Sequence, residues 1–139
     1  YAMFGVFDNG ALPSDFIARS STTGNSYINL QSDGDIFWET DTNNDGIVNV
    51  NIGTLTSGDN LLSCLLASSG TGTAFLNGAS GASASFADNS LTVDQIGGRG
   101  TSVFNTAKFK EIIIYNSDQS ANRTGIESNI ADEYGITLP

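Results

Sequence analysis

Hydrophobic and polar residues alternate along much of this chain, and short polar turns separate the alternating stretches. In residues 47–52, Val48, Val50 and Ile52 fall on one face of an extended chain, while the asparagines between them fall on the other. An alternation of period two predicts a half-buried β-strand. Similar short apolar runs bounded by turn residues predict further strands at 1–7, 15–19, 27–30, 36–39, 61–67, 73–77 and 109–115, the last of them buried.

Two polar segments are predicted to be the turns of β-hairpins. Residues 41–46 and 68–72 are rich in polar residues and glycine, and each segment separates two of the predicted strands. Residues 78–85 are all small, and we expect them to form a loose connection rather than a strand.

One short amphipathic helix is predicted near the end of the chain. It begins at Ser120, whose hydroxyl is a suitable N-cap, and it ends before Gly135, which suits the left-handed conformation of a C-cap. Ile126, Ile130 and Tyr134 recur at every fourth position and give one apolar stripe. Strands at intervals of ~8–12 residues with one terminal helix predict an all-β sandwich or barrel, with the helix over one edge or end.

Composition narrows the choice of partners. At 139 residues the chain is expected to form one domain, and 39% hydrophobic with only 14% charged residues suits a β-protein with many turns. Fifteen acidic residues against five basic ones give a formal charge of −10, which disfavours nucleic acid and anionic membranes and leaves carboxylates for cations. No run approaches the ~20 apolar residues of a membrane span, so membrane insertion is not expected.

The residue types that are missing also limit the chemistry. The sequence contains no histidine, so a Ser-His or Cys-His nucleophile cannot form within this chain. Cys64 is the single cysteine, so an internal disulfide is excluded. It lies among leucines, and we expect a small buried hydrophobic residue rather than a reactive thiol.

Four short motifs resemble a known family when they are taken in order. They are Phe-Leu-Asn-Gly at 75–78, Ile-Gly-Gly at 96–98, the apolar strand that ends in Tyr-Asn at 109–116, and the helix that ends in Tyr-Gly-Ile at 120–136. Together they resemble concanavalin A-like, laminin-G-like jelly-roll domains of microbial and phage surface proteins, over residues 61–138. The resemblance implies a two-sheet antiparallel jelly-roll sandwich with one short C-terminal helix, and it implies binding of carbohydrate or protein.

The N-terminal part of the chain matches that family only as a generic series of strands. The chain begins inside a predicted strand. We therefore expect residues 1–139 to form one such domain that lacks the N-terminal strands of the family.

A candidate metal site follows the strand at 36–39. Asp41, Asn43 and Asp45 place oxygens at alternate positions before Gly46, which resembles the start of a calcium loop. The twelfth position, where a bidentate carboxylate belongs, is Ile52. Calcium is therefore the one cofactor considered, in a loose site, and the alternative is a polar hairpin turn that needs no metal.

Two further features of the same region bear on carbohydrate chemistry. Glu39 and Asp41 resemble the start of the Glu-x-Asp-x-(x)-Glu strand of glucanases in the same superfamily, but the second glutamate is missing. We therefore expect solvent-facing carboxylates at a hairpin end and no enzymatic activity. Trp38 is a candidate carbohydrate-stacking residue; the alternative is a core position, because either Phe37 or Trp38 must face inward.

The predicted function is a non-catalytic binding or structural module on a virion, as a fibre or capsid decoration, or on a cell surface. Its expected partners are carbohydrate or neighbouring structural protein chains, and a homo-oligomer remains open. One alternative is a purely structural decoration domain without a ligand. A glycoside hydrolase remnant is a further alternative, weakened by the missing glutamate.

Overall fold

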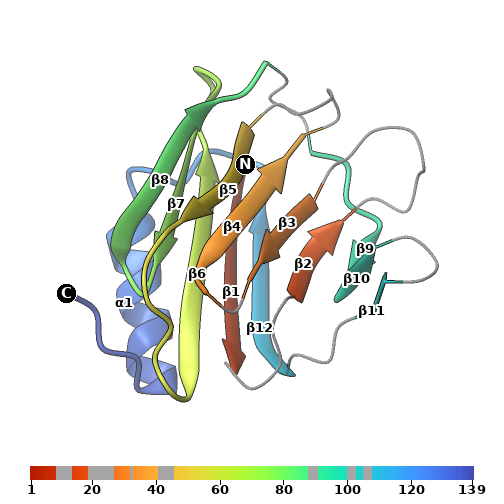
Figure 1. The fold of residues 1–139 in the computed structure, drawn as a ribbon. Coiled ribbons are helices and arrows are strands. Elements are labelled where there is room, and N and C mark those ends of the chain that lie inside the picture. The colour runs from red at the N-terminus through yellow and green to blue at the C-terminus, as the bar shows by residue number, and fades with distance from the viewer. Residues whose placement is uncertain are drawn as a thin grey trace.

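The computed structural model describes residues 1–8, 14–18, 27–31, 33–40, 46–87, 91–99, 103–104 and 108–139. Over these ranges the chain forms two five-stranded antiparallel sheets, one two-stranded sheet and one helix (Figure 1). The two-sheet sandwich with a short C-terminal helix is thereby confirmed. The elements are β1 (Ala2–Asp8), β2 (Ser14–Ala18), β3 (Tyr27–Leu30), β4 (Asp35–Glu39), β5 (Gly46–Asn51), β6 (Asp59–Leu66), β7 (Thr71–Leu76), β8 (Ala79–Ser85), β9 (Gln95–Ile96), β10 (Gly98–Arg99), β11 (Val103–Phe104), β12 (Lys108–Tyr115) and α1 (Arg123–Tyr134).

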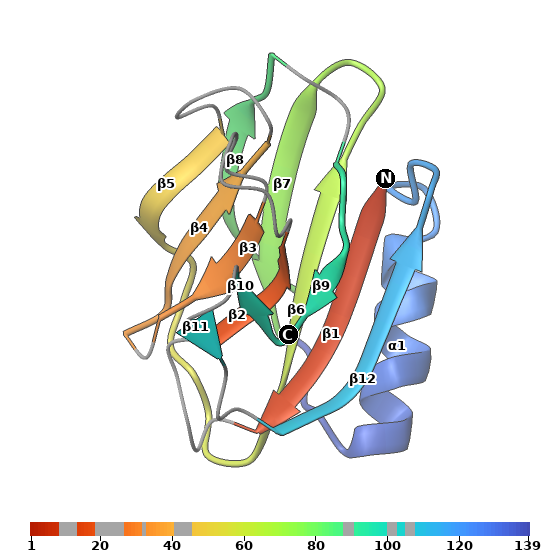
Figure 2. The same cartoon turned by 90° about the vertical axis from the view of Figure 1, so that its right-hand side faces the viewer.

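The structure has three layers. One sheet has the strand order β12-β1-β6-β7-β8, and we call it the helix-side sheet. The other has the order β5-β4-β3-β2-β9, and we call it the opposite sheet. Figure 2 shows the opposite sheet at the left, the helix-side sheet in the middle and α1 at the right. Strand β12 is at one edge of the helix-side sheet and β9 is at one edge of the opposite sheet, and residues of both strands line the candidate site.

Two apolar clusters hold these layers together, and the pleat of β1 contributes to both. Met3 and Phe7 pack between the sheets, whereas Ala2, Phe4 and Val6 pack beneath the helix. Successive side chains of a strand point to opposite faces, and alternate residues of β6 divide between the same two clusters. Both strands are therefore buried on both faces, which explains their nearly continuous apolar sequences.

The helix covers the outer face of a sheet, and the prediction that it covers an edge or end is wrong. Ile130 is 6% exposed and packs in one cluster with Phe4 of β1 and Leu65 of β6. Ile126 and Tyr134 join this cluster from the same face of the helix. The predicted apolar stripe is thus confirmed, but it lies on β1 and β6 of the helix-side sheet.

The helix begins later than predicted, because Ser120 makes other hydrogen bonds. Its backbone N–H donates to Asp118 at 2.9 Å, and its hydroxyl donates to the same carboxylate oxygen. Asn122 occupies the N-cap position without a capping hydrogen bond from its side chain, whose amide N–H donates to Gln119 instead. The predicted end is confirmed, since Gly135 has φ 67° and its N–H donates to the carbonyl of Ala131.

The predicted loose connection at 78–85 is wrong, because this segment forms β8 and pairs with β7. Asn77 and Gly78 have φ values of 50° and 81°, which is the geometry of a two-residue type I′ hairpin turn. A Cβ at Gly81 would lie 2.3 Å from Cβ of Ile52. The small residues of β8 therefore allow a close approach to the chain that follows β5.

Strand β12 also differs from its prediction. It is an edge strand, and its residues Ile112 and Ile113 are only partly buried. The other predicted strands are found within one or two residues of their expected bounds, and both predicted hairpins, β4–β5 and β6–β7, are present.

Candidate functional site

A groove opens at one edge of the sandwich, between the end of β12 and the segment that leads into β9. Its cavity volume is about 510 Å³. This size falls within the ~300–1,000 Å³ of typical small-molecule sites. The apolar part of the lining is formed by Tyr1, Leu91, Val93, Ile96 and Ile114, and the polar part by Asp94, Gln95 and Asn116, with Tyr115 completing it.

Exposed isoleucines distinguish this groove from the rest of the described surface. Among the residues whose burial is described, three large hydrophobic side chains are exposed: Ile96 at 63%, Ile114 at 45% and Val50 at 40%. The two isoleucines line the same groove, while Val50 lies on β5. Single exposed hydrophobic residues are ordinary, but two that share one concave surface indicate a binding site.

The inner wall of the groove is fixed by Tyr1 and Trp38. The indole N–H of Trp38 donates to the phenol oxygen of Tyr1 at 2.8 Å, and the two rings pack edge to face with centroids 6.1 Å apart. The backbone of Tyr1 is held by hydrogen bonds with Leu66, at 3.0 Å through its amino group and 2.9 Å through its carbonyl. Tyr1 therefore presents a preorganised surface to any ligand.

The prediction that Trp38 stacks on carbohydrate is contradicted by its position. Trp38 is 0% exposed, because it lies on the inner face of β4 between the two sheets. The centroids of the Trp38 and Phe86 rings lie 4.8 Å apart. The core alternative is the one that holds, and Trp38 supports the groove through Tyr1 without reaching it.

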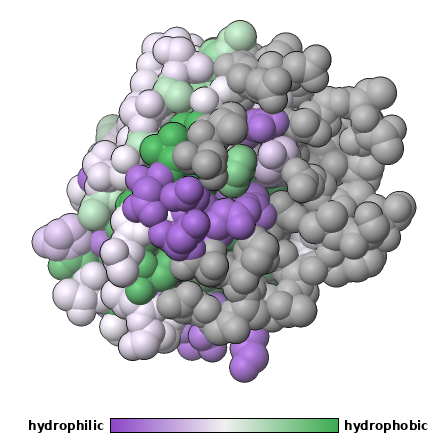
Figure 3. Space-filling view, in the orientation of Figure 1, coloured by the Kyte–Doolittle hydropathy of each residue, from purple (hydrophilic) through white to green (hydrophobic). Residues whose placement is uncertain are grey.

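The outer face of the opposite sheet carries a polar row. Tyr27, Asn29 and Glu39, together with the apolar Phe37, alternate with the core residues of β3 and β4, so they point away from the sandwich interior. Tyr27, Asn29 and Glu39 are nevertheless at most 9% exposed. Figure 3 views this face, and hydrophilic side chains gather at its centre, over β3 and β4.

Glu39 does not face solvent as predicted, because it is only 4% exposed. Its Oε1 accepts a hydrogen bond from the Tyr27 hydroxyl at 3.3 Å. Its Oε2 has no hydrogen-bond partner among the residues that the structure describes. A carboxylate closed off in this way is poorly placed to act on a bound sugar.

The candidate calcium ligands Asp41, Asn43 and Asp45 lie outside the described residues. The strands on either side of them are described, and Glu39 pairs with Gly46 at the base of the predicted hairpin. Within the described ranges, no group of three acidic or cysteine side chains is arranged to hold a metal ion.

A second, smaller hollow lies on the outer face of the helix-side sheet, where α1 begins. Its volume is about 230 Å³, and Phe75, Ser120 and Arg123 are among its lining residues. The guanidinium of Arg123 lies 4.1 Å above the ring of Phe75 and forms an ion pair with Glu127. Glu127 therefore neutralises the charge of Arg123. The contact with Phe75 connects the first turn of the helix to β7.

Glu127 is a buried charge that the sequence pattern did not reveal. It is 1% exposed, and its Oε1 has no hydrogen-bond partner among the described residues. Burial raises the pKa of this carboxyl, and the nearby Ser63 hydroxyl and the Arg123 guanidinium partly oppose the rise. Glu127 follows Ile126 and lies on the apolar side of α1, and this position was the feature of the sequence that could have indicated its burial.

Cys64 is confirmed as a buried core residue. It is fully buried between the sheets, and this burial raises the pKa of its thiol far above the usual range. A thiol in this environment is a poor nucleophile.

The fold defines the described chain as a two-sheet β-sandwich with a groove at one edge. Comparison with known proteins found no family model that matches the chain and no curated protein similar to it. The resemblance to concanavalin A-like domains therefore stays a prediction. Within the described residues, no helix has the length and apolar character needed to cross a membrane.

Proposed function

We propose that this domain is a non-catalytic binding module that attaches a virion or cell surface to glycan or protein through the groove between β9 and β12. The observation that carries the proposal is the pair of exposed isoleucines, Ile96 and Ile114, in one cavity of about 510 Å³. Complete burial of an exposed isoleucine gains about 1.5–3 kcal/mol, and roughly half of this is still to be gained here, because Ile96 is 63% and Ile114 is 45% exposed. A ligand that covers them gains this free energy.

The remaining lining suits recognition. Asp94, Gln95 and Asn116 supply carboxylate and amide groups beside the apolar floor. A few polar groups around an apolar surface fix the orientation of a ligand and give specificity. The wall formed by Tyr1 is already ordered by Trp38, so little conformational entropy is lost on binding.

A binding role without catalysis is supported by the chemistry of the side chains. The sequence lacks histidine, and Glu39, the carboxylate that begins the glucanase-like pattern, is buried with the Tyr27 hydroxyl as its partner. The groove itself contains one carboxylate, Asp94, among its lining residues, whereas glycoside hydrolysis requires a pair.

The experiment compares wild-type protein with Ile114→Lys and Ile96→Lys on a glycan array and against a displayed peptide library. Val50→Lys is the matched control, because it changes the third exposed hydrophobic residue at a distant strand. We expect at least one ligand class to bind wild type and Val50→Lys equally, and to lose about tenfold or more in affinity with either groove variant. Equal binding by all four proteins, or blank results on both platforms, would refute the proposal.

The alternative of a purely structural decoration domain is favoured by one observation, the open edge of β12. In that case a neighbouring chain covers the groove in an assembled particle. Ile114→Lys would then reduce incorporation into particles, and the free domain would bind no ligand on either platform.

A further inference from the structure

We propose that the groove receives an extended peptide segment of a partner protein, with alternating apolar residues and at least one Lys or Arg, which adds as a strand to the free edge of β12. This proposal rests on the function proposed above and names the ligand class of the same groove. It follows from the edge strand, the exposed side chains and the charges beside them.

The first half of β12 is protected against strand addition. Val6 of β1 pairs with Glu111 and Phe7 pairs with Phe109, so Lys110 is the extra residue of a β-bulge. Lys108 and Lys110 are both exposed on this half. Bulges and lysines are the features with which natural sheets prevent pairing with other chains.

The second half of β12 has no such protection. Residues 112–115 read Ile-Ile-Ile-Tyr, without a charged residue or a proline, and their pairing with β1 is regular. Among the described residues, β12 pairs with β1 alone, so its outer edge carries backbone N–H and C=O groups directed away from the sheet. An exposed edge of this kind is a template for another strand.

The groove begins where this unprotected half ends. Ile114, Tyr115 and Asn116 line it from the side of β12, and Ile96 faces them from β9. The alternate side chains of an added strand would point into the groove and contact Ile96 and Ile114. Main-chain hydrogen bonds would then supply affinity, and the groove would supply specificity for apolar side chains.

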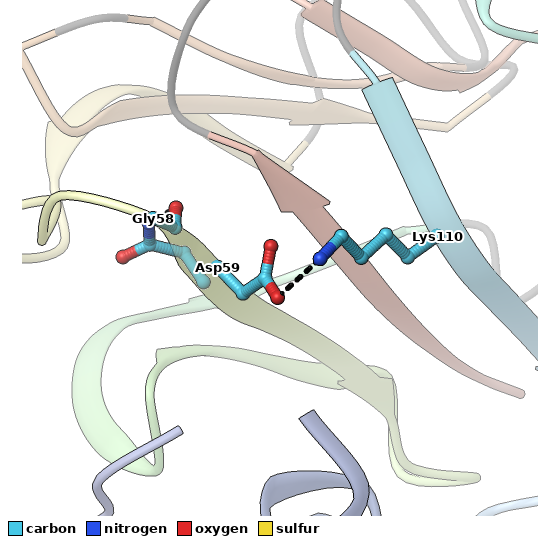
Figure 4. Close-up of polar contacts among 4 residues, drawn as sticks. Gly58, Asp59 and Lys110 are labelled. Atoms are coloured by element: carbon cyan, nitrogen blue, oxygen red, sulfur yellow. Dashed lines mark hydrogen bonds and ion pairs between the residues drawn. The ribbon is translucent and has the colours of Figure 1, made fainter. Parts of the chain in front are cut away.

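Charge determines which extended segment fits. Asp94 is the acidic residue of the lining, and the whole chain has a formal charge of −10. The positive charge of Lys110 is engaged by Asp59 of β6 at 2.6 Å, as Figure 4 shows, and this hydrogen bond raises the pKa of the Lys110 amino group. A basic segment is therefore attracted to this edge, whereas a second copy of this acidic chain is repelled.

The test uses a phage-displayed library of linear ten-residue peptides, selected on the wild-type domain. Selected peptides are labelled with fluorescein, and their affinities are measured by anisotropy. We expect apolar residues at alternate positions with Lys or Arg among them, and weaker binding as salt is raised. Ile114→Lys and Ile96→Lys should each reduce affinity about tenfold or more, while Val50→Lys should bind as wild type does. All three sites are exposed, so each variant should keep the wild-type melting temperature within a few degrees.

Amide hydrogen exchange then separates strand addition from simple docking of side chains. In the complex, exchange of the amides in residues 112–116 should slow by about tenfold or more, because new backbone hydrogen bonds form there. Protection confined to other segments, or selected peptides that bind Ile114→Lys as tightly as wild type, would overturn the proposal.

Three further outcomes also decide against it. A blank peptide library, together with a glycan whose binding is lost in Ile114→Lys, would refute the peptide ligand and leave the proposed binding function intact; blank results on both platforms would refute both. A concentration-dependent dimer in sedimentation, with residues 112–116 already protected in the unliganded protein, would identify a second copy as the occupant.

Discussion

The docking of α1 on the helix-side sheet makes a quantitative prediction for Ile130→Ala. Ile130 is 6% exposed and packs against Ala2, Phe4 and Leu65, so the substitution leaves a cavity between the helix and the sheet. Substitutions of this type cost about 2–5 kcal/mol, and we expect about 3 kcal/mol here. For a domain of this size the melting temperature should fall by about 10 °C.

Two spectroscopic signals can measure the unfolding of this variant. Trp38 is buried between the sheets, so its fluorescence reports on the sandwich, while circular dichroism at the helical minimum reports on α1. We expect both signals to change together in urea, at a lower midpoint than in wild type. Asn129→Ala, an exposed change on the same helix, is the control and should stay within about 0.5 kcal/mol of wild type.

An Ile130→Ala variant that unfolds at the wild-type midpoint would show that the packing of Ile130 does not stabilise the domain. A helical signal that disappears well before the fluorescence changes would contradict the prediction in another way. That result would mean that the helix is not part of one cooperative unit with β1 and β6.

Three further predictions concern the helix and the polar loop. Gly125→Ala should stabilise the domain by about 1 kcal/mol in urea denaturation, since the site is helical and a Cβ there meets no atom within 4 Å; a loss of stability would contradict this. The pKa of Glu127 is raised above its usual 4.5 by burial, so the native state favours the protonated acid, and the stability this provides is present below that value and lost as pH rises through the raised pKa. Glu127→Gln should therefore gain stability relative to wild type between pH 4 and pH 7 in thermal melts, and a relative loss would show that the ion pair dominates. If Asp41, Asn43 and Asp45 bind calcium, the ion at ten times its dissociation constant should stabilise wild type by about 1.4 kcal/mol and chelator should reverse the effect, so an unchanged melting temperature would dismiss the site.

Local patterns predicted the strands because burial leaves a direct trace in sequence. The apolar runs of β1 and β6 are continuous because these strands lie between two apolar layers. Strand β8 was missed because Ala, Ser and Gly have low strand propensity. It forms nevertheless, because its small residues admit Ile52 at close range.

The start of the helix was misplaced by a competition between two acceptable hydrogen-bond arrangements. Ser120 is a good N-cap in sequence, but Asp118, two residues earlier, accepts both its N–H and its hydroxyl. The local turn formed instead, and α1 begins three residues later, at Arg123. The N-cap preference of a single residue does not show whether Ser120 caps the helix or bonds to Asp118.

The groove could not be predicted, because its lining comes from three distant parts of the chain. Ile114 is the third of three consecutive isoleucines, and only the tertiary structure shows that it is exposed while its neighbours are partly buried. Trp38 was misjudged for the same reason. Its sequence neighbours allow either an inward or an outward position, and the pairing of β4 with β3 and β5 decides between them.

The pairing of β1 with β12 also determines when the sandwich can be completed during synthesis. Ala2 pairs with Tyr115, so the first strand of the described chain waits for nearly the last before one of its edges is closed. Contacts between such distant segments slow folding, because the loop must close before the contacts compensate for the lost entropy. Until β12 and α1 leave the ribosome, the apolar face formed by Phe4, Val6 and Leu61 stays uncovered. A nascent chain therefore exposes this apolar face, a surface prone to aggregation, during the whole interval between the synthesis of β6 and the synthesis of α1.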